Sequence, residues 1–115
     1  MKAAALLPSD TADVCPLLAA PGGVAHGIVS QAVLTAPGLR VTLFRFATGQ
    51  ELSEHTTSAR ALVQVLAGSC DFNLNGETRH LTAGDLLHMP PKLSHAVRAT
   101  ADLTLLITQA APPKA

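Results

Sequence analysis

The feature that most constrains this chain is a succession of short apolar and β-branched segments, each closed by residues that form turns. About nine such segments follow one another at intervals of roughly 8–12 residues, and no helical apolar period persists among them. The expected strands are Val24–Leu34, Arg40–Ala47, Leu52–Thr57, Ala61–Ala67, Cys70–Leu74, Glu77–Leu81, Leu86–Met89, Ser94–Ala99 and Leu103–Thr108. This pattern predicts an all-β sandwich or barrel.

The pair Asn75-Gly76 is the strongest local signal, because both residues tolerate the positive φ angles of a type I′ turn. The pair should therefore join two antiparallel strands at an exposed hairpin tip. In the strand before this turn, alternation puts Cys70 on the same face as Phe72 and Leu74. We expect the Cys70 thiol to belong to the core rather than to act as a nucleophile.

The composition limits the classes of partner. Of the 115 residues, 48% are hydrophobic and 14% are charged, with eight Lys and Arg balancing eight Asp and Glu. The chain is long enough for one packed domain, and it has no basic run that would neutralise several phosphates of a nucleic acid. No apolar run approaches the ~20 residues that span a bilayer. We expect neither a nucleic-acid partner nor a membrane partner.

Three parts are expected along the chain: an N-terminal arm at 1–23, a barrel domain at 24–109 and a C-terminal tail at 110–115. The arm begins with Lys2 and five apolar residues before Pro8. That apolar run is too short for a secretory signal, whose apolar region has about 7–15 residues. The expectation is therefore a cytoplasmic protein.

Histidines are the most informative polar residues, because imidazole binds metals and transfers protons near neutral pH. Alternation puts His55 on the same strand face as Ser53 and Thr57. In a later strand, a charged Arg98 belongs at the surface, which turns His95 inward. The two histidines lie far apart in the sequence, and a closed barrel would allow them to meet inside.

Two glycine-bounded segments resemble known family motifs. The first runs from Gly49 through five residues to His55 and closes at Gly68, and the second opens at Gly84-Asp85 and contains His95. Together they resemble the two motifs of the cupin superfamily, most closely the small, single-domain bacterial cupins of the RmlC-like, conserved-barrel type. The resemblance covers about residues 24–109. It implies an antiparallel double-stranded β-helix, the jelly-roll barrel of cupins.

The resemblance also implies a metal site of three histidines and one glutamate, and here the chain departs from it. His55 and His95 are retained, but Thr57 and Ala61 stand where the family has a histidine and the glutamate. Two imidazoles alone make a weak site, since three or four protein ligands are the norm. We expect one divalent ion (Ni, Zn, Mn or Fe) to be held weakly or not at all. His88, whose facing the pattern leaves open, is a further candidate ligand.

Two functions remain open from the sequence. The absence of the family's histidine at position 57 and glutamate at position 61 favours a small-molecule-binding cupin. The retained histidines favour a metal-dependent enzyme of oxygenase, isomerase or decarboxylase type. No catalytic residue is assigned. The residues expected to line the ligand pocket are His55, Thr57, Ala61, Gln64 and His95.

A homodimer is expected for a separate reason. The segment Val24–Leu34 is long and apolar, and such an exposed edge strand would invite aggregation. Pairing or exchanging this strand across a two-fold axis removes the free edge. Small cupins commonly dimerise, so the resemblance implies the same state.

Overall fold

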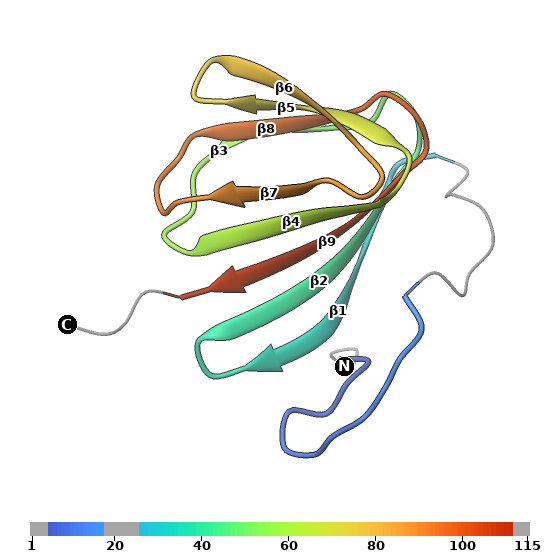
Figure 1. Cartoon of the computed structure of the whole chain (residues 1–115), viewed down its shortest axis with the longest axis vertical. Coiled ribbons are helices and arrows are strands. Elements are labelled where there is room, and N and C mark those ends of the chain that lie inside the picture. The colour runs from blue at the N-terminus through green and yellow to red at the C-terminus, as the bar shows by residue number, and fades with distance from the viewer. Residues whose placement is uncertain (1–4, 18–25, 112–115) are drawn as a thin grey trace.

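The fold was obtained as a computed structural model, which describes residues 5–17 and 26–111. These residues form nine strands and no helix (Figure 1), which confirms the predicted all-β class. The strands are β1 (Ile28–Ala36), β2 (Leu39–Phe46), β3 (Glu51–His55), β4 (Arg60–Ala67), β5 (Ser69–Leu74), β6 (Glu77–Thr82), β7 (Leu86–Met89), β8 (His95–Ala99) and β9 (Leu103–Ala110). Within this part of the chain, no helix is long and apolar enough to cross a membrane.

The strands make two antiparallel sheets that enclose the core between them. One sheet has five strands in the order β1-β2-β9-β4-β7, and the other has four in the order β3-β8-β5-β6. In Figure 1 the strands converge at one end of the barrel. At the other end β3, β7 and β9 finish and β2, β4 and β8 begin. This second end is called the open end below.

The strand boundaries follow the turn residues. The β1–β2 turn contains Gly38, whose φ is 74°, as expected for a residue after proline in a tight turn. The expected start of the first strand, Val24, lies outside the described residues, and β1 begins at Ile28. The backbone amides of Leu6 and Leu7 donate to carbonyl oxygens of β1, so the arm lies along that strand.

The predicted type I′ hairpin is confirmed. Asn75 and Gly76 have φ angles of 50° and 89°, so both residues adopt the left-handed conformation that this turn requires. The Gly76 amide donates to the side-chain oxygen of Asn73 at 2.9 Å, which satisfies a polar group at the tip. The turn joins β5 to β6.

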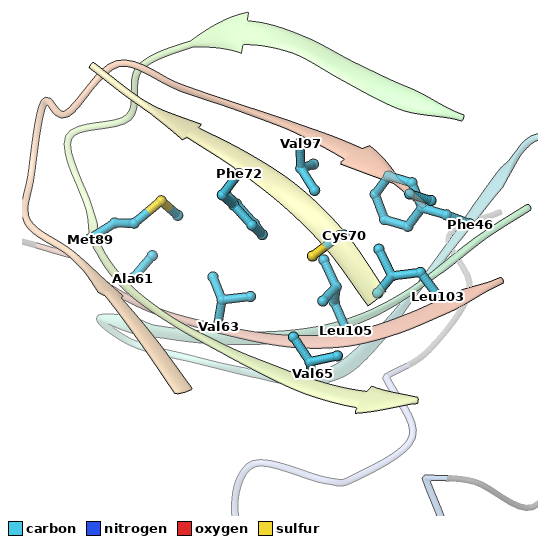
Figure 2. Packing of buried hydrophobic residues seen from close by; sticks show 11 residues of the cluster. Phe46, Ala61, Val63, Val65, Cys70, Phe72, Met89, Val97, Leu103 and Leu105 are labelled. Carbon is cyan, nitrogen blue, oxygen red and sulfur yellow. The ribbon is translucent and has the colours of Figure 1, made fainter. Parts of the chain in front are cut away.

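The core is almost wholly aliphatic, with two phenylalanines. Its members come from both sheets (Figure 2): Phe46, Ala61, Val63, Val65, Cys70, Phe72, Met89, Val97, Ala99, Leu103 and Leu105. Cys70 is fully buried, as predicted, and burial raises the pKa of its thiol from 9.0 to about 11, with smaller contributions from nearby Asp71 and Asp85. A thiol in this state is protonated and unreactive at neutral pH.

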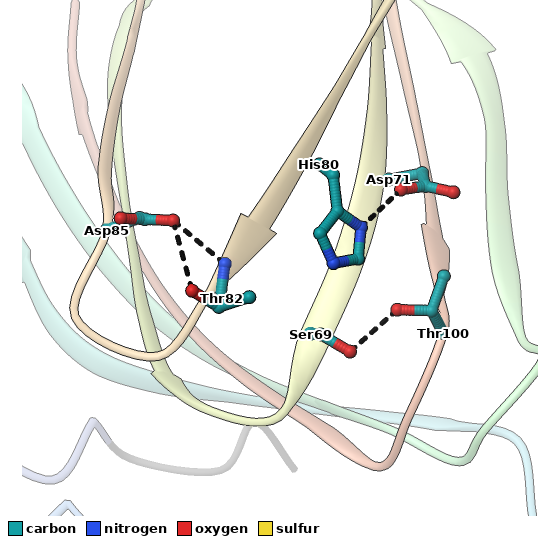
Figure 3. Close-up of polar contacts among 6 residues, drawn as sticks. All are labelled: Ser69, Asp71, His80, Thr82, Asp85 and Thr100. Carbon is teal, nitrogen blue, oxygen red and sulfur yellow. Dashed lines mark hydrogen bonds and ion pairs between the residues drawn. The ribbon is translucent and has the colours of Figure 1, made fainter.

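The outer face of the four-stranded sheet is polar. Asp71 on β5 contacts His80 on β6, with 2.7 Å between the carboxylate and Nδ1 (Figure 3). Beside this pair, the hydroxyls of Ser69 and Thr100 are hydrogen-bonded at 2.7 Å. These groups lie on the solvent side of the sheet, away from the core.

Candidate functional site

Two histidines meet at the open end of the barrel. His55 is the last residue of β3 and His95 is the first of β8, and the two are direct partners in the register of these strands. Their ring centroids lie 4.2 Å apart, with 59° between the ring planes. His95 is buried, with 7% of its surface exposed, whereas His55 is exposed. The fold therefore brings together two residues separated by 40 positions.

The backbone sets the orientation and tautomer of both rings. Nδ1 of His55 lies 2.8 Å from the carbonyl oxygen of Ser53, and Nδ1 of His95 lies 2.9 Å from that of Leu93. Because a carbonyl oxygen only accepts hydrogen bonds, Nδ1 must carry the hydrogen in each pair. In the neutral rings, Nε2 then has a free lone pair. Each Nε2 can thus accept a hydrogen bond, take up a proton or bind a metal ion.

Strict alternation along β3 was a wrong prediction. The register between β3 and β8 shifts between Leu52 and His55, so these two residues both face inward although three positions separate them. Ser53 and Glu54 instead line a hollow on the outer face of the sheet. The bulge adds one residue to β3, and this extra residue re-aims His55.

The two rings border a cavity of about 290 Å³ between the sheets. Most of its lining is apolar: Phe44, Phe46, Leu52, Ala61, Phe72, Met89, Val97, Leu105 and Ile107. The polar lining residues are Arg40, Thr42, His55, Thr57, His95 and Gln109. A largely apolar cavity with a few polar groups is typical of small-molecule sites, and this volume is at the small end of their range.

The polar groups are concentrated at the open end. Arg40, Gln109, Ala61 and Met89 form one row across the five-stranded sheet, because each is the register partner of the next. This row lies at the same end as the histidine pair, since β7 finishes at Met89 (Figure 1). Figure 2 shows Met89 and Ala61 at one end of the core and Phe46 at the other. The cavity therefore has a polar mouth and an apolar floor.

The structure places the remaining predicted site residues on both sides of the sheet. Thr57 and Ala61 line the cavity with the two histidines. Gln64 does not: it is exposed on the outer face of β4, because the buried residues of that strand are Ala61, Val63 and Val65. Including Gln64 in the pocket was therefore an error.

The facing of His88 is also settled. It is exposed on β7, and its Nε2 accepts a hydrogen bond from Nη1 of Arg60 at 2.7 Å. Met89, the next residue, is the one that faces the cavity. Because His88 uses Nε2 on the outer face, it does not join His55 and His95 as a ligand.

Sequence reasoning missed three polar lining residues: Arg40, Thr42 and Gln109. A signal for two of them was present, because Arg40 and Thr42 alternate in phase with Phe44 and Phe46 along β2. An arginine on an apolar strand face ordinarily marks a strand end, and Arg40 is the second residue of β2. No comparable signal pointed to Gln109.

The donors at the mouth do not fit a resident metal ion. A stable site for a divalent ion has three or four protein ligands, and only two imidazoles converge here. Across residues 5–17 and 26–111, no group of three or more His, Cys, Asp or Glu side chains is arranged to hold a metal. Thr57 and Ala61, at the positions of the missing ligands, offer one neutral hydroxyl and a methyl group.

Comparison with protein families finds one match. Residues 42–108 match the family described as "Cupin domain". The matched region runs from within β2 to within β9 and includes both histidines. A search of the curated proteins gave no match.

Solved structures resemble the chain at low sequence identity. A conserved protein of unknown function from Streptococcus pyogenes, SPY1581, superposes with a TM-score of 0.82 at 22% identity, covering 97% of this chain and 98% of that one. A cupin superfamily protein from Desulfitobacterium hafniense gives 0.81 at 21% identity, covering 95% and 100%. Salicylate 1,2-dioxygenase from Pseudoaminobacter salicylatoxidans gives 0.70 at 24% identity, over 78% of this chain and 28% of that enzyme. These likenesses establish the jelly-roll barrel.

Proposed function

The chain belongs to the cupin domain family, and from the geometry of its barrel we propose that it binds a small organic molecule in the cavity between its sheets. One observation carries the proposal: an apolar cavity of about 290 Å³ opens onto two imidazoles that touch each other. An apolar body would be sheltered on the floor, and a polar group would lie at the mouth.

In this proposal the histidines bind the ligand directly. Each ring already donates through Nδ1, so each Nε2 would accept a hydrogen bond from a hydroxyl or amino group of the ligand. Within the described residues, the hydrogen bond of the His95 ring is made through Nδ1, so its Nε2 lone pair is available to a donor on the ligand. A ligand with an apolar body and at least one hydrogen-bond donor satisfies both parts of the site.

A second candidate is a metal-dependent enzyme of oxygenase, isomerase or decarboxylase type. The observation that favours it is the pair of carbonyl oxygens that hold the two Nδ1 atoms, because metal-ligating histidines are commonly oriented in this way. The donor set weighs against a resident metal, since two further ligands would have to come from outside the protein.

The experiment is a titration of tag-free protein with neutral probes, benzyl alcohol and cyclohexanol, followed by the amide resonances in NMR spectra. We expect saturable shifts for residues that line the cavity. Ala61→Phe should abolish them, because the new ring occupies the cavity. The matched control is Leu62→Phe, which places the same aromatic ring on the exposed outer face of the same strand.

The possible outcomes separate the two candidates. Shifts that persist in Ala61→Phe would place binding outside the cavity and contradict the proposal. Shifts that appear only after addition of a divalent metal would favour the enzyme instead.

A further inference from the structure

Arg40 distinguishes this cavity from a merely apolar hollow. Apart from the histidines, it is the one ionisable side chain among the described residues that line the cavity, and no Asp or Glu accompanies it there. It lies at the start of β2, with Thr35 and Gln109 as its register partners on the two neighbouring strands. A permanent positive charge therefore stands at the polar mouth.

The same residue borders a second hollow. This space, of about 260 Å³, is lined by Thr35, Ala36, Gly38, Leu39, Arg40, Thr57, Ala59, Gln109 and Ala111. Arg40, Thr57 and Gln109 belong to both linings and thus stand where the two spaces adjoin. Among the described residues, Arg40 is the one Lys, Arg, Asp or Glu side chain in either lining, so the formal charge of these side chains at the junction is positive.

No carboxylate of the described chain neutralises Arg40. The ion pairs found within these residues are Arg79–Glu77 and His80–Asp71, and Arg40 takes part in neither. Glu51, Glu54 and Asp71 line a hollow on the outer face of the four-stranded sheet, where Figure 3 shows Asp71 with His80. The guanidinium is therefore available to an anion from outside.

We infer that the ligand carries a carboxylate, which Arg40 holds at the mouth with Thr57 and Gln109, while its apolar body fills the cavity. This inference rests on the proposed function. A guanidinium matches the two oxygens of a carboxylate in a planar, bidentate geometry. One arginine balances one negative charge, which favours a carboxylate over a phosphate carrying nearly two.

The neighbouring groups complement this assignment. The Thr57 hydroxyl accepts a hydrogen bond from the Ala59 amide at 3.2 Å, which leaves its own hydrogen available for an anion. The side-chain amide of Gln109 supplies further N–H donors beside Arg40. The ligand class is a small aromatic or branched aliphatic carboxylic acid, with a hydroxyl or amino group suited to the two Nε2 atoms.

The test uses matched acid and amide probes. Benzoate and benzamide have the same shape, but only benzoate is charged, so their ratio of Kd values isolates the charge. We expect wild-type protein to bind benzoate about tenfold or more tightly than benzamide, as expected for hydrogen bonds to a charged group. Arg40→Gln should remove this preference, because benzoate then loses its charged partner while the cavity is otherwise unchanged.

The matched control is Arg45→Gln on the same strand. Arg45 lines an outer hollow with Val29, Gln31 and Leu43, so it faces away from the cavity. Arg45→Gln removes the same charge from the protein as Arg40→Gln does, but the preference for benzoate over benzamide should stay. Loss of the preference in both variants would indicate a general charge effect and overturn the assignment to Arg40.

The remaining outcomes are distinct. If benzamide and benzoate bind equally to wild type, the carboxylate inference is wrong while the small-molecule function stands. If phenyl phosphate binds more tightly than benzoate, the ligand class is wrong. If neither acid nor amide binds, and the neutral alcohols also fail, the proposed function falls with the inference.

Discussion

His55 and His95 touch, yet they differ in exposure, and this difference assigns them different parts in the site. His95 lies at the wall of the cavity, with 7% of its surface exposed, while His55 stands at the rim. Both depend on backbone carbonyls for their tautomer. Their convergence could be anticipated from strand alternation and the charge of Arg98. The position of Ser53 could not, because a bulge interrupts the alternation in β3.

Completing the ligand set should create a metal site. We expect Thr57→His together with Ala61→Glu to raise the affinity for Ni, Zn, Mn or Fe(II) by roughly a hundredfold or more, because two donors become four. Both positions line the cavity with the histidines. Calorimetric titration of wild type and variant measures the change.

The control for this gain is Thr57→His with Leu62→Glu, which carries the same residue types but directs the carboxylate outward from β4. Its metal affinity should rise far less than that of the variant with Thr57→His and Ala61→Glu. An equal gain in both variants would show that the metal is held at the surface.

Cys70 should make stability depend on pH in the alkaline range. Its pKa is 9.0 when unperturbed and about 11 in the folded protein, where burial disfavours the thiolate. Between these values the unfolded chain ionises this thiol while the folded chain does not. The free energy of unfolding should therefore be intact below pH 9 and fall on the order of 2 kcal/mol as the pH rises toward 11.

Urea unfolding of wild type and Cys70→Ala across this range isolates the effect. The variant loses packing at all pH values, but the difference between the two proteins should shrink as the pH rises. A difference that stays constant would contradict the shifted pKa.

At the scale of elements, the β4–β5 turn contains a position, residue 68, that only glycine can occupy. Gly68 has a φ of 84°, and a side chain there would overlap the backbone carbonyl of Asp102 in the β8–β9 turn. This close approach binds together two turns at the converging end of the barrel. The glycine was noticeable in the sequence as the end of the first motif, but the neighbour that requires it was not, since it lies 34 positions later in the chain.

Gly68→Ala should be strongly destabilising, by about 3 kcal/mol or more, because left-handed strain adds to the clash with backbone. Gly76→Ala is the matched control. Gly76 has a similar φ of 89°, yet nothing lies within 4 Å of an added Cβ, so about 1 kcal/mol is expected from strain alone. Chemical denaturation compares the two, and equal losses would show that the contact with Asp102 is unimportant.

At the scale of the whole molecule, the spacing of turns was enough to predict nine strands and the barrel, because each turn residue acts locally. The cavity was harder to foresee. Its volume depends on how far apart two twisted sheets pack, and Arg40 and Gln109 reach it through a register that joins β2 to β9. Placing Gln64 in the pocket went against the alternation of β4, which already sets it on the face opposite Ala61, Val63 and Val65, and the structure follows that alternation.

A homodimer remains our prediction for the assembly. β1 is an edge strand of the five-stranded sheet; Leu6 and Leu7 of the arm bond to its middle, and Val29 near its start is 51% exposed. Leu62 and Leu86 on the same sheet are also exposed apolar side chains. Light scattering should give twice the monomer mass, and Val29→Lys should shift it toward the monomer. Thr78→Lys, on the other sheet, should leave the dimer unchanged; a monomeric wild type would contradict the prediction.

The central claim, that this barrel binds a small molecule in its cavity, is tested most directly by a crystal structure with 4-bromobenzyl alcohol, in which anomalous scattering locates the bromine. We predict a bromine peak on the apolar floor near Phe44 and Leu105, with the hydroxyl at the mouth within hydrogen-bond distance of Nε2 of His55 or His95. A bromine peak only on the outer faces of the sheets, with the cavity holding no probe, would contradict the claim.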